Sequence, residues 1–136
     1  MSQELEQLKM AWLGLNARVE QLAAEHQQYH EFFENAGAAY VVTAADGRIV
    51  EANGAAVDVL QRRKRYLRGK PLVVLIALER RAEFRNRLTS IAAGETAERS
   101  WRTVLTAGGE RVEVGLTARV IEQPGGGICW RLAALQ

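Results

Sequence analysis

Apolar residues recur through residues 5–33 at alternating steps of three and four positions. An average repeat of 3.5 residues is typical of a helix that pairs with a second helix in a coiled coil. Residues 2–34 contain no proline and are rich in Glu, Gln, Leu and Ala, which favour the helical state. We therefore predict an N-terminal amphipathic coiled-coil helix as a domain over residues 1–30. Its dimer interface, continued to the last apolar position of the repeat, consists of Leu5, Leu8, Trp12, Leu15, Val19, Leu22, His26, Tyr29 and Phe33.

The length of this helix favours pairing with a second copy of the chain. A helix of about 33 residues is about 50 Å long, whereas a domain of about 100 residues has a radius of gyration of about 13 Å. Such a domain is too small to cover the helix along its whole length. The alternative is an amphipathic helix that packs on its own domain. The spacing does not decide between parallel and antiparallel pairing.

His26 and His30 stand one helical turn apart, a spacing that can place two imidazoles on one metal ion. No Cys, Asp or third His lies nearby in the sequence to complete the site, so we predict no metal. His26 is then a polar interruption of the helix seam, which could also tune helix pairing with pH.

The composition is that of a globular domain. The chain has 136 residues, of which 48% are apolar and 25% charged, and this balance excludes a disordered chain. Cys129 is the single cysteine, which excludes a disulfide scaffold. The longest apolar run, residues 72–78, is far shorter than the ~20 residues that span a membrane. Since no secretory signal is visible, we expect a cytoplasmic protein.

The rest of the chain alternates between strand and helix patterns. Strands are expected at residues 38–44 and 48–51, on either side of the hairpin turn signal Asp46-Gly47. Asn53 is placed to cap the helix that follows it. Short helices or turns are expected next, at residues 54–60, 62–68 and 72–77, and a longer amphipathic helix at residues 79–93. Three strands follow, at residues 98–106, 110–122 and 128–135. This order predicts the α+β class.

Several of these motifs together resemble the bacterial PAS sensory and signalling family. Residues 32–60, FFENAGAAYVVTAADGRIVEANGAAVDVL, are similar to the first half of such a domain, and Asn53 matches the family's Asn motif. Residues 67–72, LRGKPL, are similar to the segment that precedes the family's short helix. Gly108 and Gly109 stand where PAS domains usually carry Asp-Gly. The motifs occur in the family's order.

The resemblance implies a PAS domain over residues 31–136, with a five-stranded antiparallel sheet, helices on one face and a small pocket. Such domains sense ligands or mediate dimerisation, and they pass a signal through a helix at one end. The candidate pocket is lined by apolar residues of the strands and helices, although such residues usually form plain core: Tyr40, Val42, Leu60, Ile76, Phe84, Leu88, Leu116, Trp130 and Leu132.

The family's cofactor-binding residues are missing from this sequence. Haem-binding members use a His in or just beyond the long helix, and residues 79–93 contain none. Flavin photosensors need a Cys after the second helix, whereas residues 60–65 contain none and Cys129 lies in the last strand. We therefore predict no haem and no flavin adduct, and a non-covalent small ligand stays open. No set of catalytic residues converges in the sequence, so we predict that the protein is not an enzyme.

Positive charge is concentrated in the middle of the chain. Residues 62–87 carry ten basic and two acidic residues, whereas residues 1–34 carry six glutamates and two basic residues. The basic face consists of Arg62, Arg63, Lys64, Arg65, Arg68 and Lys70. It is either a solvated surface or a docking site for an acidic partner. Nucleic acid is not expected, because no helix with base-reading residues is apparent.

These observations predict a regulatory PAS module of signal transduction. It would homodimerise through its N-terminal helix and relay the binding of a ligand or partner to an output domain or a partner protein. The alternative is a ligand-free dimerisation and protein-interaction adaptor, with an acidic partner docked on the basic face.

Overall fold

The structure is a computed structural model that describes residues 2–94, 99–121 and 126–135. Within its first helix, the side chains of five residues lie outside this description: Ser2, Leu15, Asn16, Val19 and Tyr29. The chain divides into two compact units, Met1–Glu34 and Asn35–Gln136.

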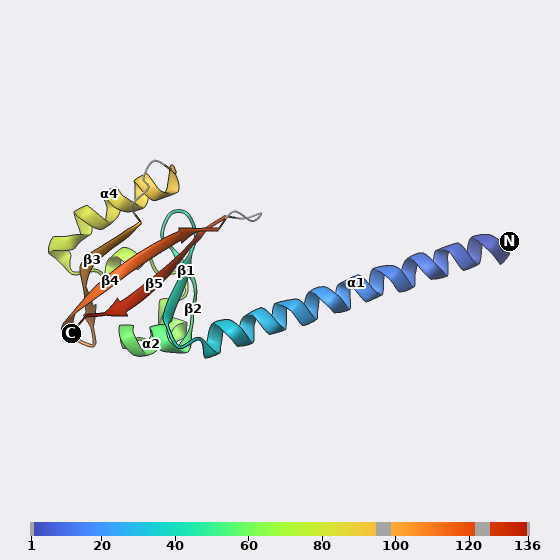
Figure 1. Cartoon of the computed structure of the whole chain (residues 1–136), viewed down its shortest axis with the longest axis horizontal. Helices are drawn as coiled ribbons and strands as arrows, with labels where there is room; N and C mark the ends of the chain where they lie inside the picture. The colour runs from blue at the N-terminus through green and yellow to red at the C-terminus, as the bar shows by residue number, and fades with distance from the viewer. Residues whose placement is uncertain (1, 95–98, 122–125, 136) are drawn as a thin grey trace. The chain divides into compact units, whose positions relative to one another are not determined.

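The described residues of the first unit all belong to α1, Ser2–Asn35, whose last residue is counted with the second unit (Figure 1). Its sequence has no proline that would break the helix, and Gly14 sits in it without interrupting it. Among the described residues, no helix is long and apolar enough to cross a membrane.

The second unit is built on a five-stranded sheet in the order β2-β1-β5-β4-β3, with every neighbouring pair antiparallel. Its strands are β1 Ala39–Thr43, β2 Ile49–Ala52, β3 Ser100–Ala107, β4 Glu110–Val120 and β5 Ile128–Ala134. The predicted α+β class and five-stranded antiparallel sheet are confirmed. Two of the predicted strand ends, Glu98 and Glu122, lie outside the described residues.

The turn between β1 and β2 follows the predicted Asp46-Gly47 signal. Gly47 has a φ of 91°, a left-handed conformation that glycine adopts without a steric penalty. Its N–H donates to the carbonyl of Ala44, and the N–H of Arg48 donates to Oδ1 of Asp46 at 3.0 Å. The backbone and the Asp46 side chain together close the hairpin.

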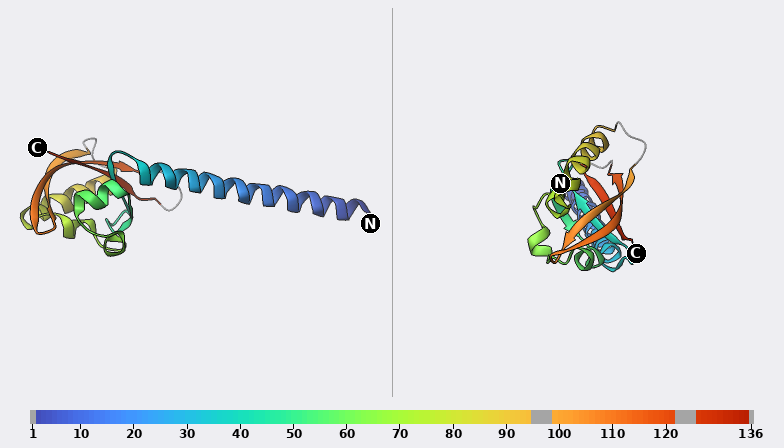
Figure 2. Two further views of the ribbon diagram at one scale, coloured as in Figure 1. Left: turned by 90° about the horizontal axis from the view of Figure 1, so that it is seen from below. Right: turned by 90° about the vertical axis from the view of Figure 1, so that its left-hand side faces the viewer.

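The helices of the second unit lie between β2 and β3 in sequence and cover one face of the sheet (Figure 2). They are α2 Gly54–Leu60, α3 Lys64–Leu67, η1 Leu72–Leu75, η2 Leu78–Arg80 and α4 Arg81–Ala92. The short element expected over residues 72–77 is the 3-10 helix η1. The helix expected over residues 79–93 begins as the 3-10 turn η2 and becomes α-helical at Arg81.

The core lies between the helices and one face of the sheet. On β4, Val114, Leu116 and Ala118 are buried, and the residues between them are more exposed, as the alternation of the sequence predicts. From the helices, Phe84 and Leu60 are completely buried against this face. Burial of this apolar surface is the main source of stability for the second unit.

Candidate functional site

Three aromatic rings form the centre of the interior. Phe84 comes from α4, Trp101 from β3 and Trp130 from β5. The ring centroid of Phe84 lies 5.3 Å from that of Trp130 and 6.4 Å from that of Trp101. The two indoles meet edge to face, with centroids 5.9 Å apart and an interplanar angle of 82°. These distances are in the range in which aromatic pairs attract each other beyond simple burial.

The indole N–H of Trp130 has a hydrogen-bond partner inside the core. Nε1 donates to Oγ1 of Thr43 at 2.9 Å, and both side chains are buried. The bond joins β5 to the neighbouring strand β1. Because the N–H is satisfied by the protein, Trp130 offers an incoming molecule only its ring.

Trp101 and Thr103 differ from Trp130 in this respect. Nε1 of Trp101 and Oγ1 of Thr103 are buried and make no hydrogen bond within the described chain. The two residues are only 8% and 3% exposed, and they stand two positions apart on β3, so they face the same side of the sheet. Each unpartnered buried polar group costs about 1–3 kcal/mol. A molecule that offers hydrogen bonds to both groups would recover part of that free energy.

Arg87 of α4 lies over the ring of Trp101. Its guanidinium carbon is 4.9 Å from the ring centroid of Trp101, a cation–π contact. Its Nε is 3.7 Å from Oε1 of Glu83, one turn earlier on the same helix. The Arg87 side chain is 36% exposed, so it covers the indole from the solvent side. A molecule that reached Trp101 from this direction would have to displace it.

Most of the predicted pocket residues do meet in this interior. Leu88 is half-buried and packs against one buried cluster. Six of the predicted residues belong to that cluster: Leu60, Ile76, Phe84, Leu116, Trp130 and Leu132. The structure therefore brings these side chains together, as expected for either a ligand pocket or plain core.

The structure does not bring Tyr40 and Val42 together with the other predicted pocket residues. Along β1, Ala39, Val41 and Thr43 are buried, whereas Tyr40 and Val42 are half-buried on the opposite face of the sheet. The physical reason is the two-residue repeat of a strand, which sends neighbouring side chains to opposite faces. Since β1 is apolar at most positions, its sequence alone does not identify the inner face.

Sequence reasoning missed Trp101 and Thr103. A signal was present, because Trp101, Thr103 and Leu105 alternate with Arg102 and Val104 along β3. The register also pairs Trp101 with Leu116, a residue that was predicted to line the pocket. The strand was expected, but its faces were not assigned, and so its polar contribution to the interior was overlooked.

Asn53 holds together the first segments of the second unit. As predicted, it caps α2, because its Oδ1 accepts from the N–H of Ala56 at 3.0 Å. The same oxygen accepts from the N–H of Tyr40, and Nδ2 donates to the carbonyl of Ala38 at 2.9 Å. The side chain is completely buried. Asn53 therefore fixes the start of β1 to the start of α2.

Along α1, the described side chains of the predicted seam are exposed at Leu5, Leu8, Trp12, Leu22 and His26. Phe33, in the last turns of the helix, is buried. The seam positions Leu15, Val19 and Tyr29 are helical, and their side chains lie outside the description. An apolar stripe of this kind on a single helix is a surface that a partner could cover.

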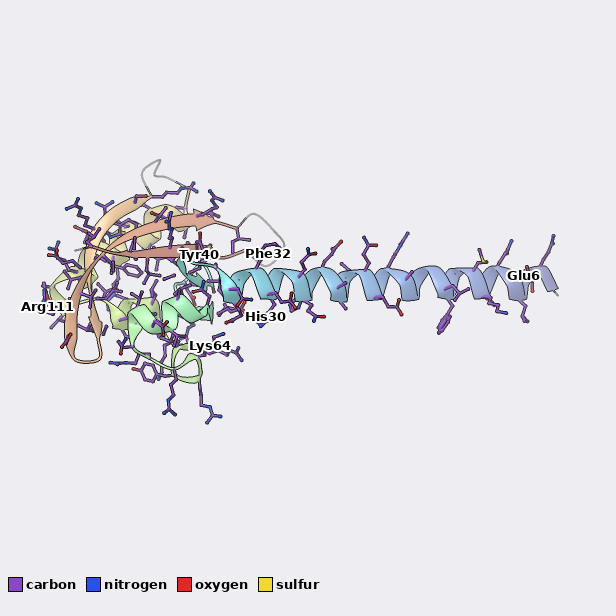
Figure 3. The ribbon with its side chains drawn as sticks, turned by 60° about the horizontal axis from the view of Figure 1, so that its bottom comes forward. Glu6, His30, Phe32, Tyr40, Lys64 and Arg111 are labelled. Atoms are coloured by element: carbon purple, nitrogen blue, oxygen red, sulfur yellow. The ribbon has the colours of Figure 1, made fainter. Side chains whose placement is uncertain are left out.

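The predicted basic face occupies the connection from α2 to η1, which includes α3. All six of its residues are at least partly exposed: Arg62, Arg63, Lys64, Arg65, Arg68 and Lys70. Around Lys64, long side chains that end in nitrogen project into the solvent (Figure 3).

The geometry defines a small α+β domain with an aromatic interior between its sheet and its helices. A family model described as the PAS fold matches residues 27–133, and the chain belongs to the PAS family. The predicted membership in the PAS family is thus confirmed. Comparison with curated proteins finds no match.

Solved PAS domains share this fold at low sequence identity. One is the PAS domain of an HTR-like protein from Haloarcula marismortui, with a TM-score of 0.72 and 16% identity, covering 88% of this chain and 99% of that one. A second is a domain of a sensory box sensor histidine kinase/response regulator from Geobacter sulfurreducens, with a TM-score of 0.66, 16% identity and coverages of 81% and 95%.

A third is the PAS domain, in complex with ethanol, of a LuxR-family transcriptional regulator from Burkholderia thailandensis. Its TM-score is 0.63 and its identity 21%, and the match covers 79% of this chain and 96% of that one. At sequence identities this low, the structural likeness establishes a shared fold and nothing more.

Proposed function

We propose that the chain is a sensory module of signal transduction that binds a small molecule in its interior without chemical conversion. The observation that carries the proposal is the pair of unpartnered buried groups, Nε1 of Trp101 and Oγ1 of Thr103. Membership in the PAS family supports a sensory role. So does the fold shared with a sensor histidine kinase domain and with a regulator domain in complex with ethanol.

The chemistry of the interior describes the ligand. Trp101 offers an N–H, which requires a hydrogen-bond acceptor, whereas Thr103 offers a hydroxyl that donates or accepts. The surrounding side chains, such as Phe84 and Leu116, are apolar. A small molecule with one hydroxyl or carbonyl group on an apolar body fits this combination. The binding is non-covalent, and the proposal includes neither haem nor a flavin adduct.

A signal could leave the interior through α2 and Asn53. Leu60 and Ala56 of α2 belong to the core, and Asn53 connects the first turn of this helix to the carbonyl of Ala38. Ala38 is separated from α1 by two residues of chain. A shift of α2 on ligand binding would therefore pull directly on the backbone that joins α1 to the sheet.

We further propose that α1 pairs with the α1 of a second copy. The heptad spacing supports this, and so does the exposure of Leu5, Leu8 and Leu22 at 71%, 71% and 65%. Pairing would bury these side chains and allow a change in helix packing to reach an output domain or a partner protein.

Native mass spectrometry and fluorescence titration with small alcohols, ketones and aldehydes test the ligand. We expect a bound small molecule in the wild-type protein, either copurified or added. Thr103→Val and Trp101→Phe should both weaken binding, because each removes one polar group, and Thr103→Val does so at nearly constant size. The control is Thr117→Val, the same change at an exposed position of β4. Equal binding by all four proteins, or no binding by any, would contradict the proposal.

Light scattering at several protein concentrations tests the pairing of α1. The wild type should be a dimer at tens of micromolar, and the double variant Leu8→Glu/Leu22→Glu a folded monomer. The double variant Gln7→Glu/Gln28→Glu introduces the same charge at heptad positions outside the seam, and it should stay dimeric. A monomeric wild type would refute pairing, as would a dimeric seam variant.

A further inference from the structure

Five of the seven residues that line a recess on the surface of the second unit are cationic. Its lining residues lie between the end of α2 and the start of η1: Gln61, Arg62, Arg63, Arg65, Tyr66, Arg68 and Lys70. We call this recess the Tyr66 surface. It shares no lining residue with the aromatic interior, so what it binds is independent of the proposed sensory function.

The backbone beneath the Tyr66 surface is fixed to the sheet. The N–H of Gly69 donates to the carbonyl of Ile49, and the N–H of Ile49 donates to the carbonyl of Lys70, both at 2.8 Å. Leu67 anchors the segment from inside, because it is only 1% exposed. A surface held in place before binding loses less conformational entropy when a partner arrives.

The chain turns sharply at the edge of this surface. Gln61 has a φ of 54°, a left-handed conformation that is uncommon for a residue with a side chain. It ends α2, where its N–H donates to the carbonyl of Val57, and its Nε2 donates to the carbonyl of Asp58 at 2.6 Å. These bonds stabilise the turn that redirects the chain into Arg62 and Arg63.

Among the described residues, the cations of the Tyr66 surface have no carboxylate partner. Within the described chain, none of the following residues forms an ion pair: Arg62, Arg63, Arg65, Arg68 and Lys70. Elsewhere in the unit arginines are paired, as Arg111 is with Glu79 and Arg48 with Asp46. Five like charges within nine residues repel one another, and an anion placed among them would relieve that repulsion.

Tyr66 provides an aromatic centre for these charges. Its side chain is 46% exposed, and its ring centroid lies 5.7 Å from Cζ of Arg62 and 5.3 Å from Nζ of Lys70. Tyrosine and arginine are among the residue types enriched at the energetic centres of protein–protein interfaces. The composition therefore favours a protein as the partner.

We propose that the Tyr66 surface docks an acidic segment of a partner protein. Arginine guanidinium groups bind carboxylates through paired hydrogen bonds, and Tyr66 would contact an apolar side chain of the same segment. Duplex DNA fits less well, because α3 has only four residues and offers no helix long enough to read a groove. A membrane also fits less well, because Leu67, the aliphatic residue of α3, is buried and cannot insert.

The test uses the whole chain and a fluorescein-labelled peptide of alternating Glu and Ser residues around a central Leu. Fluorescence anisotropy should show binding that weakens as salt is raised, and two-dimensional amide NMR spectra should localise the shifts to residues 61–70. A peptide with Gln in place of Glu should not bind. Absence of binding by the Glu peptide would overturn the proposal.

Variants of the chain test whether the peptide binds to the Tyr66 surface or to positive charge anywhere on the protein. Arg62→Gln/Arg65→Gln/Arg68→Gln should weaken binding about tenfold or more, and Tyr66→Ala should weaken it at constant charge. The control removes three exposed arginines of the sheet and should bind as the wild type does: Arg102→Gln, Arg119→Gln and Arg131→Gln. Equal loss in the control would overturn the proposal. So would tighter binding of duplex DNA, or of vesicles with anionic lipid, at the same salt.

Discussion

At the scale of single residues, Asn53 connects three segments of the backbone through its side chain. Its two side-chain polar atoms make three hydrogen bonds, to the backbone of Ala38, Tyr40 and Ala56. The bonded backbone groups lie where β1, β2 and α2 meet, and the side chain of Asn53 takes the place of the water that would otherwise bind them. Replacement of Asn53 would therefore leave several backbone groups unpaired at once.

We expect Asn53→Ala to lower the free energy of unfolding by about 2–4 kcal/mol, because a helix cap and two further hydrogen bonds are lost. Asn53→Asp keeps the accepting oxygen but replaces the donor that faces the carbonyl of Ala38, so it should recover only part of this loss. Urea unfolding of the three proteins measures the difference. An alanine variant as stable as the wild type would contradict this role.

Cys129 is a second residue with a specific expectation. It is half-buried on β5, and burial raises the pKa of its thiol above the ordinary value of 9.0, although the charge of Arg119 opposes the change. Because burial disfavours the thiolate in the folded state, the thiol leaves the free energy of unfolding unchanged well below pH 9.0 and lowers it as pH rises from there through the higher folded pKa.

Alkylation by iodoacetamide checks this shift, because only the thiolate reacts. The pH profile of the folded protein should have its midpoint above that of the protein unfolded in urea. The free energy of unfolding should fall with pH above 9.0 more steeply in the wild type than in Cys129→Ala. Coincident alkylation profiles for folded and unfolded protein would show that burial does not perturb the thiol.

At the scale of elements, the junction of β5 with β1 depends on one close approach of two backbones. Gly127 precedes β5 with a φ of 132°, and a Cβ on it would lie 2.7 Å from the carbonyl oxygen of Thr43. Thr43 is the residue whose hydroxyl accepts from Trp130. A displacement of this backbone would therefore disturb the interior as well as the strand pairing.

Gly127→Ala should destabilise the protein more than Gly109→Ala. Both glycines have a positive φ, so both changes incur backbone strain of about 1–2 kcal/mol. At Gly109 a Cβ meets nothing within 4 Å, whereas at Gly127 it meets backbone that cannot move freely. Thermal unfolding of the two variants gives the comparison. Equal melting temperatures would show that the Thr43 carbonyl moves without cost.

Individual elements also show how far the sequence predicts the structure. The Asp46-Gly47 turn, the Asn53 cap and the inner face of β4 were predictable, because each depends on a local pattern or a strict alternation. The inner face of β1 was not, because Val42 is as apolar as Val41 and Tyr40 also has a large apolar ring. The unpartnered state of Trp101 and Thr103 was also hidden, because it depends on what α4 and the other strands place around them.

At the scale of the whole molecule, the two compact units have very different interiors. The described core lies almost entirely in Asn35–Gln136, where the sheet and its helices bury their own apolar surface. The unit Met1–Glu34 is one helix. Helices gain most of their stability from packing, so the helix unit should depend on a partner and the sheet unit should not.

A fragment of residues 35–136 should therefore fold alone. We expect it to unfold cooperatively in urea, with a near-ultraviolet circular dichroism spectrum close to that of the sheet unit in the full chain. A peptide of residues 1–34 should gain helix content as its concentration rises. An unfolded sheet fragment would show that the helix supplies part of the fold, and a concentration-independent peptide would speak against pairing.

The edge-to-face contact of Trp101 and Trp130 gives the molecule an internal optical probe. Both indoles are buried, whereas Trp12 on α1 is 62% exposed. After Trp12→Phe, the remaining emission would come entirely from the two indoles of the interior, at the short wavelengths typical of tryptophan shielded from water. A molecule that binds to Nε1 of Trp101 would shift that emission, so occupancy could be followed in real time without any label.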